Sequence, residues 1–244
     1  LTNKLLTVLT LDFQNNKPNL VLVQGDTTTA YAAALASFYL KIPVGHIEAG
    51  LRTNKIYEPF PEEINRRLIS QLSTLHFAPT QKSKFNLINS GIKEKILVTG
   101  NTSIDSLLYT SNIASKFRVK NLDWINDKFI LVTVHRRENW GDKLLNILSG
   151  LKKILEKHPD IKMLIPTHPN KEVKVPIYKF FSNNPRVLLT SSLNYKQMVD
   201  SIKKCEFIIT DSGGLQEEAP SLGKPVLVIR NFTERVEAVD HGTA

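Results

Sequence analysis

Ionisable side chains that could move protons follow several apolar runs of this 244-residue sequence. Asp26 ends the run "VLVQGD", Glu48 follows "IPVGHI", and Glu62 comes directly after a proline. His135 closes the run "FILVTV". Taken singly, each has an ordinary explanation, such as capping the next helix for Asp26 or meeting the helix dipole for Glu62. Carboxylates and a histidine at strand ends that face one cleft are instead the pattern of a general acid and base site.

A second set of candidate site residues lies in the stretch "FIITDSGGLQEEAP". Ser212, Gly213 and Gly214 follow a predicted strand and precede a predicted helix, so their backbone N–H groups could cradle the oxygens of a diphosphate. Glu218 lies one turn into that helix, where its carboxylate could accept hydrogen bonds from ribose hydroxyls. Arg235, beyond the next strand, could add a positive charge for the phosphates. The run is neither a Walker A loop nor a GxGxxG motif.

The composition restricts the class of protein. Hydrophobic residues make up 41% of the chain, which describes a globular protein with a full core. The single cysteine, Cys205, permits no intrachain disulfide, and we expect it to be buried and structural. The net charge is +9, but the basic residues are scattered, so nucleic acid is not the expected partner. No apolar run approaches the roughly 20 residues of a membrane span, and we expect a cytoplasmic protein with no membrane partner.

Apolar runs of strand length alternate with helical stretches along the chain, after an expected amphipathic helix at the start. Such alternation predicts an α/β fold in which parallel sheets carry helices on both faces. Between residues 104 and 127 the pattern weakens, which predicts a boundary between a domain at 1–115 and a second domain at 128–244. Two Rossmann-like domains of this kind would leave a ligand cleft at the carboxyl ends of their strands.

Taken together and in order, several motifs resemble those of the non-hydrolysing UDP-N-acetylglucosamine 2-epimerases. The motifs are "GDTTTAYAAALAS", "GHIEAGLRT", "PFPEEINRR", "VTVHRRENWG", "PTHPN" and "DSGGLQEEAPSLGKPVLVIRNFTERVEAVDHGT". The resemblance implies a GT-B-like fold and an isomerase that interconverts UDP-N-acetylglucosamine and UDP-N-acetylmannosamine, with neither a cofactor nor a metal. It also implies that UDP leaves as the C2 proton is removed, that 2-acetamidoglucal forms, and that UDP returns after reprotonation on the opposite face. Such an enzyme supplies sugars for surface polysaccharides.

The resemblance assigns roles to the acidic residues and the histidine by motif. Asp26, Glu48 and Glu62 match the acid and base carboxylates of the family, and which of them serves each face of C2 stays open. His135 matches the residue that protonates or stabilises the departing UDP. Where carboxylates crowd a partly desolvated cleft, at least one raised pKa is expected.

The nucleotide-binding positions of the family match a further set of residues. These are Ser212, Gly213, Gly214, Glu218 and Arg235. Tyr195 and Met198 fall where relatives hold uracil, although Met198 stands where some members have an aromatic residue. His168 in "PTHPN" is a further candidate. The expected partner is therefore a small UDP-sugar, and a homodimer is expected from the family alone.

The sequence also departs from the family pattern. The Gly-Thr-Arg-Pro-Glu segment expected near the start does not occur, and the chain stops at "DHGTA", so it resembles an internal fragment that we expect to be poorly active or inactive by itself. Alternatives stay open at this point: an epimerase for a UDP-2,3-diacetamido uronic acid, or a non-catalytic module that binds a nucleotide sugar. A GT-B glycosyltransferase is disfavoured, because the carboxylates of "HIEAG" and "PEEINR" have no known counterpart there.

Overall fold

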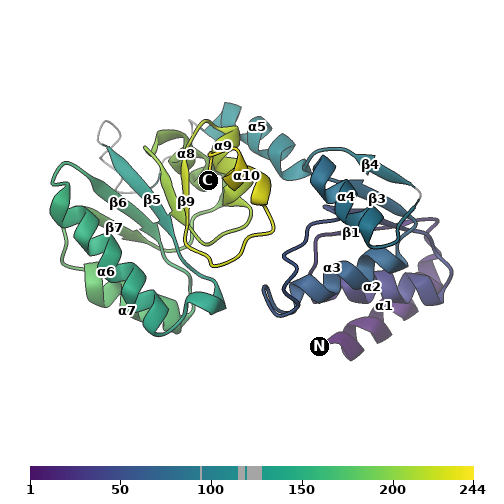
Figure 1. Ribbon diagram of the computed structural model, residues 1–244. Helices are drawn as coiled ribbons and strands as arrows, with labels where there is room; N and C mark the ends of the chain where they lie inside the picture. Colours follow the sequence, from purple (N-terminus) through teal and green to yellow (C-terminus); the bar gives the residue numbers. More distant parts are fainter. Residues whose placement is uncertain (94, 115–118, 120–127) are drawn as a thin grey trace. The chain divides into compact units, whose positions relative to one another are not determined.

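The computed structural model describes residues 1–93, 95–114, 119 and 128–244, and it divides into two compact units (Figure 1). The units are Leu1–Thr102 and Ser103–Ala244, and each is described by itself. Both contain a sheet whose observed strand pairs are all parallel. Parallel neighbours need a crossover connection, which explains why strands and helices alternate in the sequence. The predicted α/β class with parallel sheets is therefore confirmed.

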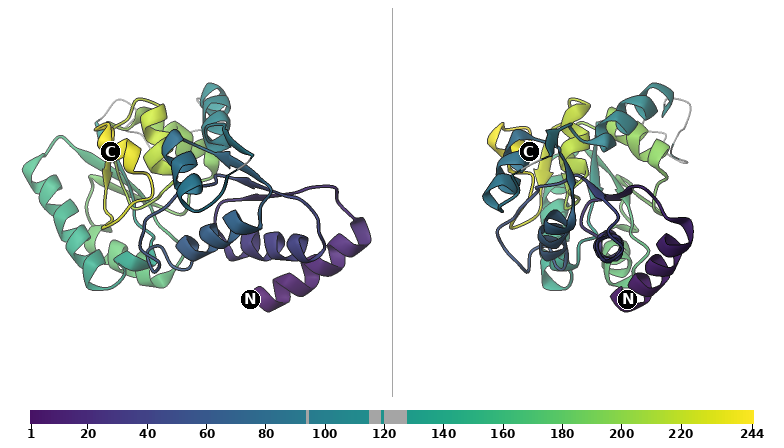
Figure 2. Two further views of the ribbon diagram at one scale, coloured as in Figure 1. Left: turned by 45° about the vertical axis from the view of Figure 1, so that its right-hand side comes forward. Right: turned by 90° about the vertical axis from the view of Figure 1, so that its right-hand side faces the viewer.

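The first unit has a four-stranded sheet with the order β1-β2-β3-β4. Its strands are β1 (Val21–Gln24), β2 (Val44–Ile47), β3 (Leu75–Ala78) and β4 (Ile96–Val98). Its helices are α1 (Thr2–Asn16), α2 (Thr28–Tyr39), α3 (Glu62–Leu72) and α4 (Gln81–Asn89). The helix expected at the start of the chain is confirmed, and the turned views show it in purple beside α2 (Figure 2).

The alanine-rich helix α2 packs directly on the first sheet. Ala30 and Ala34 form one buried cluster with Val23 of β1 and Val44 of β2, and Ile69 of α3 completes it. Small side chains let the helix backbone approach the strands closely, so the run of alanines has a packing reason. The helix begins with a cap from Thr27, whose Oγ1 accepts a hydrogen bond from Ala30 N at 3.1 Å. Capping, the ordinary role considered for Asp26, therefore belongs to its neighbour.

The second unit has a five-stranded sheet with the order β7-β6-β5-β8-β9. Its strands are β5 (Phe129–Thr133), β6 (Lys162–Pro166), β7 (Val187–Thr190), β8 (Ile208–Thr210) and β9 (Val226–Val228). Its helices are α5 (Thr102–Ala114), which begins at the last residue of the first unit, the short 3₁₀ helix η1 (Arg137–Asn139), α6 (Asp142–Lys157), α7 (Lys171–Phe181), α8 (Tyr195–Lys204), α9 (Leu215–Ser221) and α10 (Val236–Asp240).

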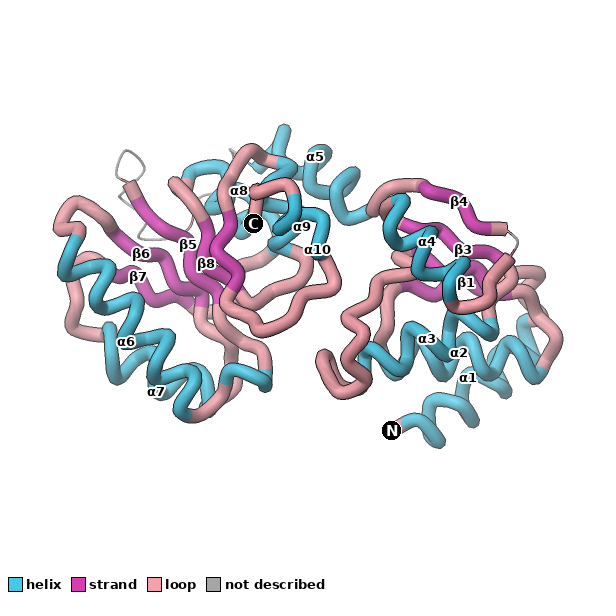
Figure 3. The backbone as a smooth tube through the Cα atoms, viewed as in Figure 1, coloured by secondary structure: helices cyan, strands magenta, loops and turns pink. Residues whose placement is uncertain are grey.

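Alternate residues of β5 face two different cores, one on each side of the second sheet. Ile130 and Val132 pack with α6 and α7, whereas Phe129 and Leu131 pack with α8 and α9. All five residues of this strand are buried, as expected for the central strand of a parallel sheet with two covered faces. Figure 3 shows the strands in magenta with helices on either side. Burial on both faces fixes the strand, so the polar residues that follow it are held in place.

Helix α5 occupies part of the stretch 104–127, in which the sequence showed no clear period. Leu107 of α5 is buried against Val199 of α8, and Lys203 Nζ donates to the carbonyl of Ser111 at 2.7 Å. The rest of that stretch, apart from Val119, lies outside the described residues. The predicted domain bounds, 1–115 and 128–244, stay a prediction. Within the described ranges, no helix combines the length and the apolar character needed to cross a membrane.

Candidate functional site

A pocket of about 350 Å³ lies at the carboxyl ends of four strands of the second sheet. Its lining residues are Thr133, Val134, His135, Pro166, His168, Ser192, Leu193, Tyr195, Met198, Ser212, Gly214, Leu215 and Glu218. Parallel α/β sheets bind ligands at this edge, because loops that follow neighbouring strands converge there. The pocket therefore brings together most of the site residues that the sequence predicted in this unit, although Gly213 and Arg235 do not line it.

His135 forms a pair with a buried carboxylate that the sequence analysis did not select. The imidazole Nδ1 lies 3.1 Å from Oδ1 of Asp211, which follows β8. The side chain of Asp211 is fully buried, whereas that of His135 is 37% exposed. A carboxylate can only accept, so Nδ1 carries the proton and Nε2 is left to act on a ligand. The ring also stacks on His168, with the ring centroids 6.1 Å apart.

Asp211 is held as a charged acceptor by several donors. The backbone N–H groups of His135 and Arg136 donate to its Oδ2 at 3.0 and 2.9 Å, and Asn139 Nδ2 donates to the same oxygen at 3.0 Å. Burial by itself raises the pKa of Asp211, but the hydrogen bond and charge of His135, with the other donors, outweigh burial and hold the pKa below its ordinary value. A carboxylate held in this way stabilises a protonated imidazole and fixes its orientation.

Two threonines support the turn that follows β8. Thr133 and Thr210 are register partners on β5 and β8, and their Oγ1 atoms lie 2.6 Å apart. The backbone N–H of Ser212 donates to Thr210 Oγ1 at 2.9 Å. Thr210 Oγ1 therefore accepts from the turn and shares a second hydrogen bond with the hydroxyl of Thr133. This chain of hydrogen bonds fixes the start of the Ser212 to Gly214 loop at the pocket wall.

Glu218 and Tyr195 face the pocket from two helices. The hydroxyl of Tyr195 hydrogen-bonds the carboxylate of Glu218. Burial, followed by the charge of Glu217, raises the pKa of Glu218. Burial and the charge of Glu218 likewise raise the pKa of Tyr195. The pair presents oxygen acceptors beside the apolar side chain of Met198, which suits a ligand with hydroxyl groups and a flat ring.

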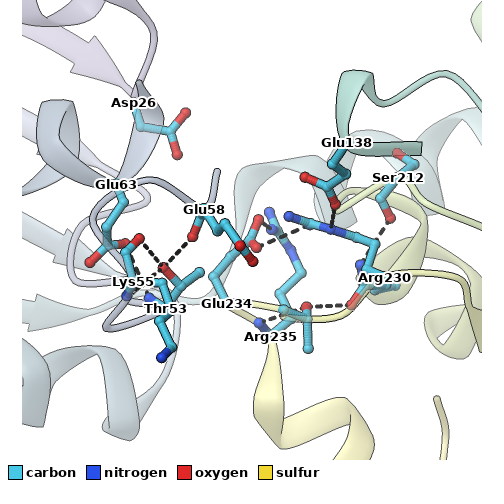
Figure 4. Close-up of polar contacts among 12 residues, drawn as sticks. Asp26, Thr53, Lys55, Glu58, Glu63, Glu138, Ser212, Arg230, Glu234 and Arg235 are labelled. Atoms are coloured by element: carbon cyan, nitrogen blue, oxygen red, sulfur yellow. Dashed lines mark hydrogen bonds and ion pairs between the residues drawn. The ribbon is translucent and has the colours of Figure 1, made fainter. Parts of the chain in front are cut away.

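Arg235 forms ion pairs with two carboxylates of its own unit. Its Nε donates to Glu217 Oε1 at 2.5 Å, and its Nη1 is paired with Glu234 (Figure 4). Glu234 also accepts from the buried Arg230 at 3.2 Å. The guanidinium lies on Gly213, where an added Cβ would be only 2.6 Å from Nη1. Gly213 is therefore required by this close approach, and Arg235 borders the loop of Ser212, Gly213 and Gly214 as part of an ion-pair network.

His168 reaches the pocket from the loop after β6. Its Nδ1 accepts a hydrogen bond from the backbone N–H of Asn170 at 3.2 Å. In the neutral ring the proton therefore lies on Nε2, which makes this nitrogen a donor. Asn170 in turn caps α7 through its side chain, which accepts from Glu172 N at 2.9 Å. The loop that carries His168 is thus fixed by the start of the next helix.

In the first unit, Asp26 lies at the end of β1 and pairs with Arg66 of α3. Arg66 Nε donates to Asp26 Oδ2 at 3.1 Å, and the Nη2 of Arg66 contacts the same oxygen. Arg66 also lies 3.3 Å from Glu63, which is fully buried and accepts from the backbone N–H of Thr53 at 3.1 Å (Figure 4). Glu63 is thus a structural residue, and Asp26, with 24% of its side chain exposed, is the accessible carboxylate of the group.

Glu48 lies beside the glycine that precedes Asp26, and Glu62 begins the helix that carries its partner Arg66. The Oε2 of Glu48 lies 3.3 Å from the position that a Cβ on Gly25 would occupy, directly before Asp26. Glu62 is the first residue of α3, one turn before the Arg66 that pairs with Asp26. Residues four apart share a helix face, so Glu62 lies on the side of α3 that meets the end of β1. The carboxylates predicted from the sequence in this unit therefore belong to neighbouring elements.

Two other kinds of chemistry, that of a reactive thiol and that of a bound metal ion, would require an accessible cysteine or a cluster of metal-binding side chains. Cys205 is fully buried, as predicted, and burial raises the pKa of its thiol to about 12, so the thiol is protonated at neutral pH. No group of three or more His, Cys, Asp or Glu side chains in the described ranges is arranged to hold a metal ion. The absence of a cofactor stays a prediction.

Sequence reasoning missed Asp211, Asn139 and the paired threonines. The signal for Asp211 was present, because an aspartate directly after a buried strand lies at the same sheet edge as the histidine that follows the neighbouring strand. Nothing in the sequence shows that β5 and β8 are neighbours, since they are separated by β6 and β7 along the chain. The partner of His135 therefore could not be assigned from the sequence.

Known proteins resemble this chain over nearly all of its length. The family model described as UDP-N-acetylglucosamine 2-epimerase matches residues 1–244. A UDP-N-acetylglucosamine 2-epimerase of Campylobacter jejuni is 51% identical over an alignment of 238 residues, and the match covers 93% of this chain and 62% of that protein. A Thermotoga maritima relative is also 51% identical, and the match covers 93% of this chain and 61% of that protein. The chain thus spans less than two thirds of the length of these relatives.

Solved structures are similar as well. The crystal structure of UDP-GlcNAc 2-epimerase from Neisseria meningitidis bound to UDP-GlcNAc has a TM-score of 0.93 and 48% identity, and the match covers 98% of this chain and 67% of that one. A co-structure of S. aureus MnaA with UDP has a TM-score of 0.94 and 43% identity, with 98% and 66% covered. The predicted GT-B-like α/β fold class is confirmed by these matches.

Proposed function

The chain belongs to the UDP-N-acetylglucosamine 2-epimerase family, and on that premise we propose that the protein interconverts UDP-N-acetylglucosamine and UDP-N-acetylmannosamine. The observation that carries the proposal is the pairing of His135 with the buried Asp211 at the wall of a pocket suited to a nucleotide. A protein that only bound UDP would need neither this pair nor the carboxylates of the first unit. The chain covers only part of its relatives, so the activity is proposed for the whole protein that carries it.

The pocket of the second unit is proposed to hold UDP. Tyr195 and Met198 border the uracil, and Glu218 accepts from the ribose hydroxyls. Because the Ser212 N–H already donates to Thr210, the backbone N–H groups of Gly213 and Gly214 are the ones proposed to bind the diphosphate, with Arg235 beside the loop. The proposal is supported by the volume of about 350 Å³, which lies in the range of small-molecule sites, and by the apolar and polar groups mixed along its wall.

His135 is proposed to assist the departure of UDP. Its Nδ1 donates to Asp211, so Nε2 is the nitrogen that can give a proton to, or form a charged hydrogen bond with, the leaving phosphate oxygen. The negative charge of Asp211 stabilises the imidazolium that this role requires. When UDP returns to the sugar, the same nitrogen takes the proton back.

Asp26, Glu48 and Glu62 are proposed as the groups that remove and return the C2 proton. Loss of that proton places an electron pair in a new bond between C1 and C2 as the bond from C1 to UDP breaks, which gives 2-acetamidoglucal and UDP. A proton delivered to the opposite face of C2, followed by the return of UDP to C1, gives the epimer. Asp26 bound to Arg66 and Glu48 beside Gly25 are held at fixed positions, as proton transfer requires.

The experiment that tests the function incubates the purified whole protein that carries this chain with UDP-N-acetylglucosamine in deuterated water and follows C2 by proton NMR. We expect UDP-N-acetylmannosamine with deuterium at C2. The Asp26→Asn, Glu48→Gln and Glu62→Gln variants then separate the two faces, because loss of one base blocks exchange from one epimer before the other. Glu206→Gln, at an exposed position, is the control for a general effect of removing a carboxylate.

The same experiment distinguishes the proposed epimerase from the two alternatives, a module that only binds the nucleotide sugar and an epimerase with another substrate. Bound UDP without exchange or product would overturn the epimerase proposal in favour of a binding module, whereas turnover of a UDP-2,3-diacetamido uronic acid alone would change the substrate. We expect the 244-residue chain by itself to turn over poorly, and clear turnover by it would contradict that expectation. A cytoplasmic homodimer that supplies surface polysaccharide synthesis is part of the proposal.

A further inference from the structure

The turn formed by Gly25 and Asp26 is held by donors from two other elements. His46 of β2 has its Nε2 atom 2.8 Å from the carbonyl oxygen of Gly25. Asn65 of α3 donates from Nδ2 to the carbonyl oxygen of Asp26 at 2.9 Å, and Arg66 binds the carboxylate of Asp26. Both carbonyls of the turn and the side chain that follows β1 are therefore fixed by side chains rather than by the sheet.

The contact from His46 has a defined direction. A carbonyl oxygen only accepts, so Nε2 carries the proton and donates to Gly25. His46 is fully buried, and its Nδ1 has no hydrogen-bond partner among the described residues. Burial lowers the pKa of His46 to about 4, and the neighbouring His76, Arg52 and Arg66 add to this effect, so the ring is neutral near pH 7. It neither carries charge nor exchanges protons with a ligand at that pH.

A buried histidine with an unpaired nitrogen is a costly choice for a strand. A buried polar atom without a partner destabilises the folded state, which an apolar side chain at the same position would avoid. Neighbouring positions of β2 hold Val44 and Ile47. The one contact that an apolar residue could not make is the hydrogen bond to Gly25, so this bond is the physical reason for a histidine here.

Gly25 connects His46 to two of the three proposed carboxylates, Asp26 and Glu48. Its φ is +71°, and its N–H donates to the carbonyl of Ile47 at 3.0 Å. Its Cα faces the carboxylate of Glu48, because an added Cβ would lie 3.3 Å from Oε2. Asp26 is the next residue along the chain. A change in the orientation of the Gly25 peptide would therefore move Asp26 and open space beneath Glu48.

We propose that His46 is a positioning residue of the epimerase site, which fixes Asp26 and Glu48 through its hydrogen bond to the Gly25 carbonyl. The inference rests on the proposed function, because it assumes that these two carboxylates handle the C2 proton. His46 itself touches no substrate. Its contribution is geometric, and a displacement of about 1 Å in a group that transfers a proton can lower the rate by about 100-fold.

The chain offers a closely matched control in His76. This residue is the register partner of His46 on β3, is also buried, and also has an Nδ1 without a partner in the described part of the chain. Its Nε2 lies 2.9 Å from the carbonyl of Ser70 in α3, whereas the Nε2 of His46 contacts the carbonyl of Gly25. A His76→Leu variant therefore removes a buried ring from the neighbouring strand and keeps the hydrogen bond between His46 and Gly25.

The first measurement compares His46→Leu, His46→Gln and His76→Leu in the epimerase assay and in calorimetric titration with UDP. We expect His46→Leu to lower kcat by about 10- to 100-fold while KM and the Kd for UDP stay within about twofold. His46→Gln, whose amide can still donate to Gly25, should retain kcat within about fivefold, and His76→Leu should resemble the wild type. Equal kcat losses in His46→Leu and His76→Leu, or no rescue by glutamine, would overturn the proposal.

A second measurement is independent of activity. Amide hydrogen exchange is followed in the peptide that contains residues 22–28, whose Gly25 N–H is hydrogen-bonded in the native protein. We expect exchange there to accelerate at least about tenfold in His46→Leu and to stay unchanged in His76→Leu. Unchanged exchange in both would overturn the positioning role. If the wild-type whole protein lacks epimerase activity, the proposed function fails, and this exchange result still decides whether His46 holds the turn.

Discussion

At the level of single residues, polar side chains of the candidate site form hydrogen bonds and ion pairs with other residues of the chain. His135 is oriented by Asp211, and Asn139 links that carboxylate to the carbonyl of Ile229 at 3.1 Å, at the end of β9. Arg235 rests on Gly213 and pairs with carboxylates on both of its sides. These contacts determine which nitrogen of the His135 imidazole remains for a ligand and fix the position of the Arg235 guanidinium. Two substitutions test them.

Asp211→Asn should reduce turnover much more than nucleotide binding. Asparagine can place a donor where Asp211 now accepts from His135, so the imidazole loses both its orientation and the charge that stabilises its protonated form. We expect kcat to fall by about 100-fold or more, with the Kd for UDP changed by less than about fivefold. Steady-state kinetics and calorimetric titration with UDP provide the two values.

Asp200→Asn is the matched control for that variant. Asp200 is also buried, at 2% exposure, but it pairs with Lys204 on its own helix and makes no contact with His135. It should cost stability without a comparable loss of kcat. If both variants lose the same fraction of kcat, the effect of Asp211 would be one of general stability, and its orienting role would be refuted.

Gly213→Ala should weaken UDP binding. The new methyl group would lie 2.6 Å from Nη1 of Arg235 and 3.0 Å from Oε1 of Glu234, so the arginine must move away from the loop. We expect the Kd for UDP to rise roughly tenfold, the equivalent of about one charge-assisted contact. Gly150→Ala is the control, because a Cβ on that exposed residue of α6 meets nothing within 4 Å. An unchanged Kd in Gly213→Ala would show that Arg235 does not need this position.

At the level of elements, short buried strands and well-capped helices hold the site. The strands of the second sheet are three to five residues long and end in register, so the residues that follow β5 and β8 emerge side by side. Helix α8 brings Tyr195 and Met198 to the pocket, and its first turn is fixed by a capping box between Asn194 and Gln197. The geometry of the pocket therefore depends on where α8 begins.

Asn194→Ala should destabilise the second unit. The Oδ1 of Asn194 accepts from Gln197 N at 2.9 Å, and the side chain of Gln197 accepts from Asn194 N at 3.2 Å. Loss of such a cap costs about 1 kcal/mol of unfolding free energy. Urea unfolding followed by far-UV circular dichroism measures the change, with Asn183→Ala as an exposed control. Equal midpoints for the two variants would mean that the capping box contributes nothing measurable.

At the level of the whole molecule, each unit has its own sheet and its own core, and the two carry different chemistry. The first unit contains the carboxylates together with two buried, neutral histidines, and the second contains the pocket with the His135 and Asp211 pair. A unit with an independent core can respond to solution conditions on its own. The buried histidines give the first unit a specific response to acid.

Stability should fall as the pH drops from about 6.5 toward 4. Burial lowers the pKa of His46 to about 4 and lowers that of His76, so the unfolded chain binds protons in this range that the folded chain does not. We expect His46 alone to remove about 2 kcal/mol of unfolding free energy between pH 7 and pH 5. The raised pKa of Glu218 acts with the opposite sign in the same range.

Urea unfolding at pH 7 and pH 5 isolates the histidines when the wild type is compared with a double variant, His46→Leu with His76→Leu. Glu218 is present in both proteins, so its contribution cancels in the difference. The double variant should lose less free energy between the two pH values than the wild type does. Equal losses in the two proteins would contradict the assignment of acid sensitivity to the buried rings.

The sequence alone determined the alternation of strands and helices, the α/β class, the family resemblance and the positions of polar residues after strands. These features are local, because side-chain periodicity and turn chemistry act over a few residues. Partners were decided only by the tertiary structure: Asp211 lies 76 residues from His135, and Arg66 lies 40 residues from Asp26. Which strands become neighbours is settled when two cores close around a sheet, so the contacts that orient His135, engage Arg235 and hold Gly25 depend on packing that no single segment encodes.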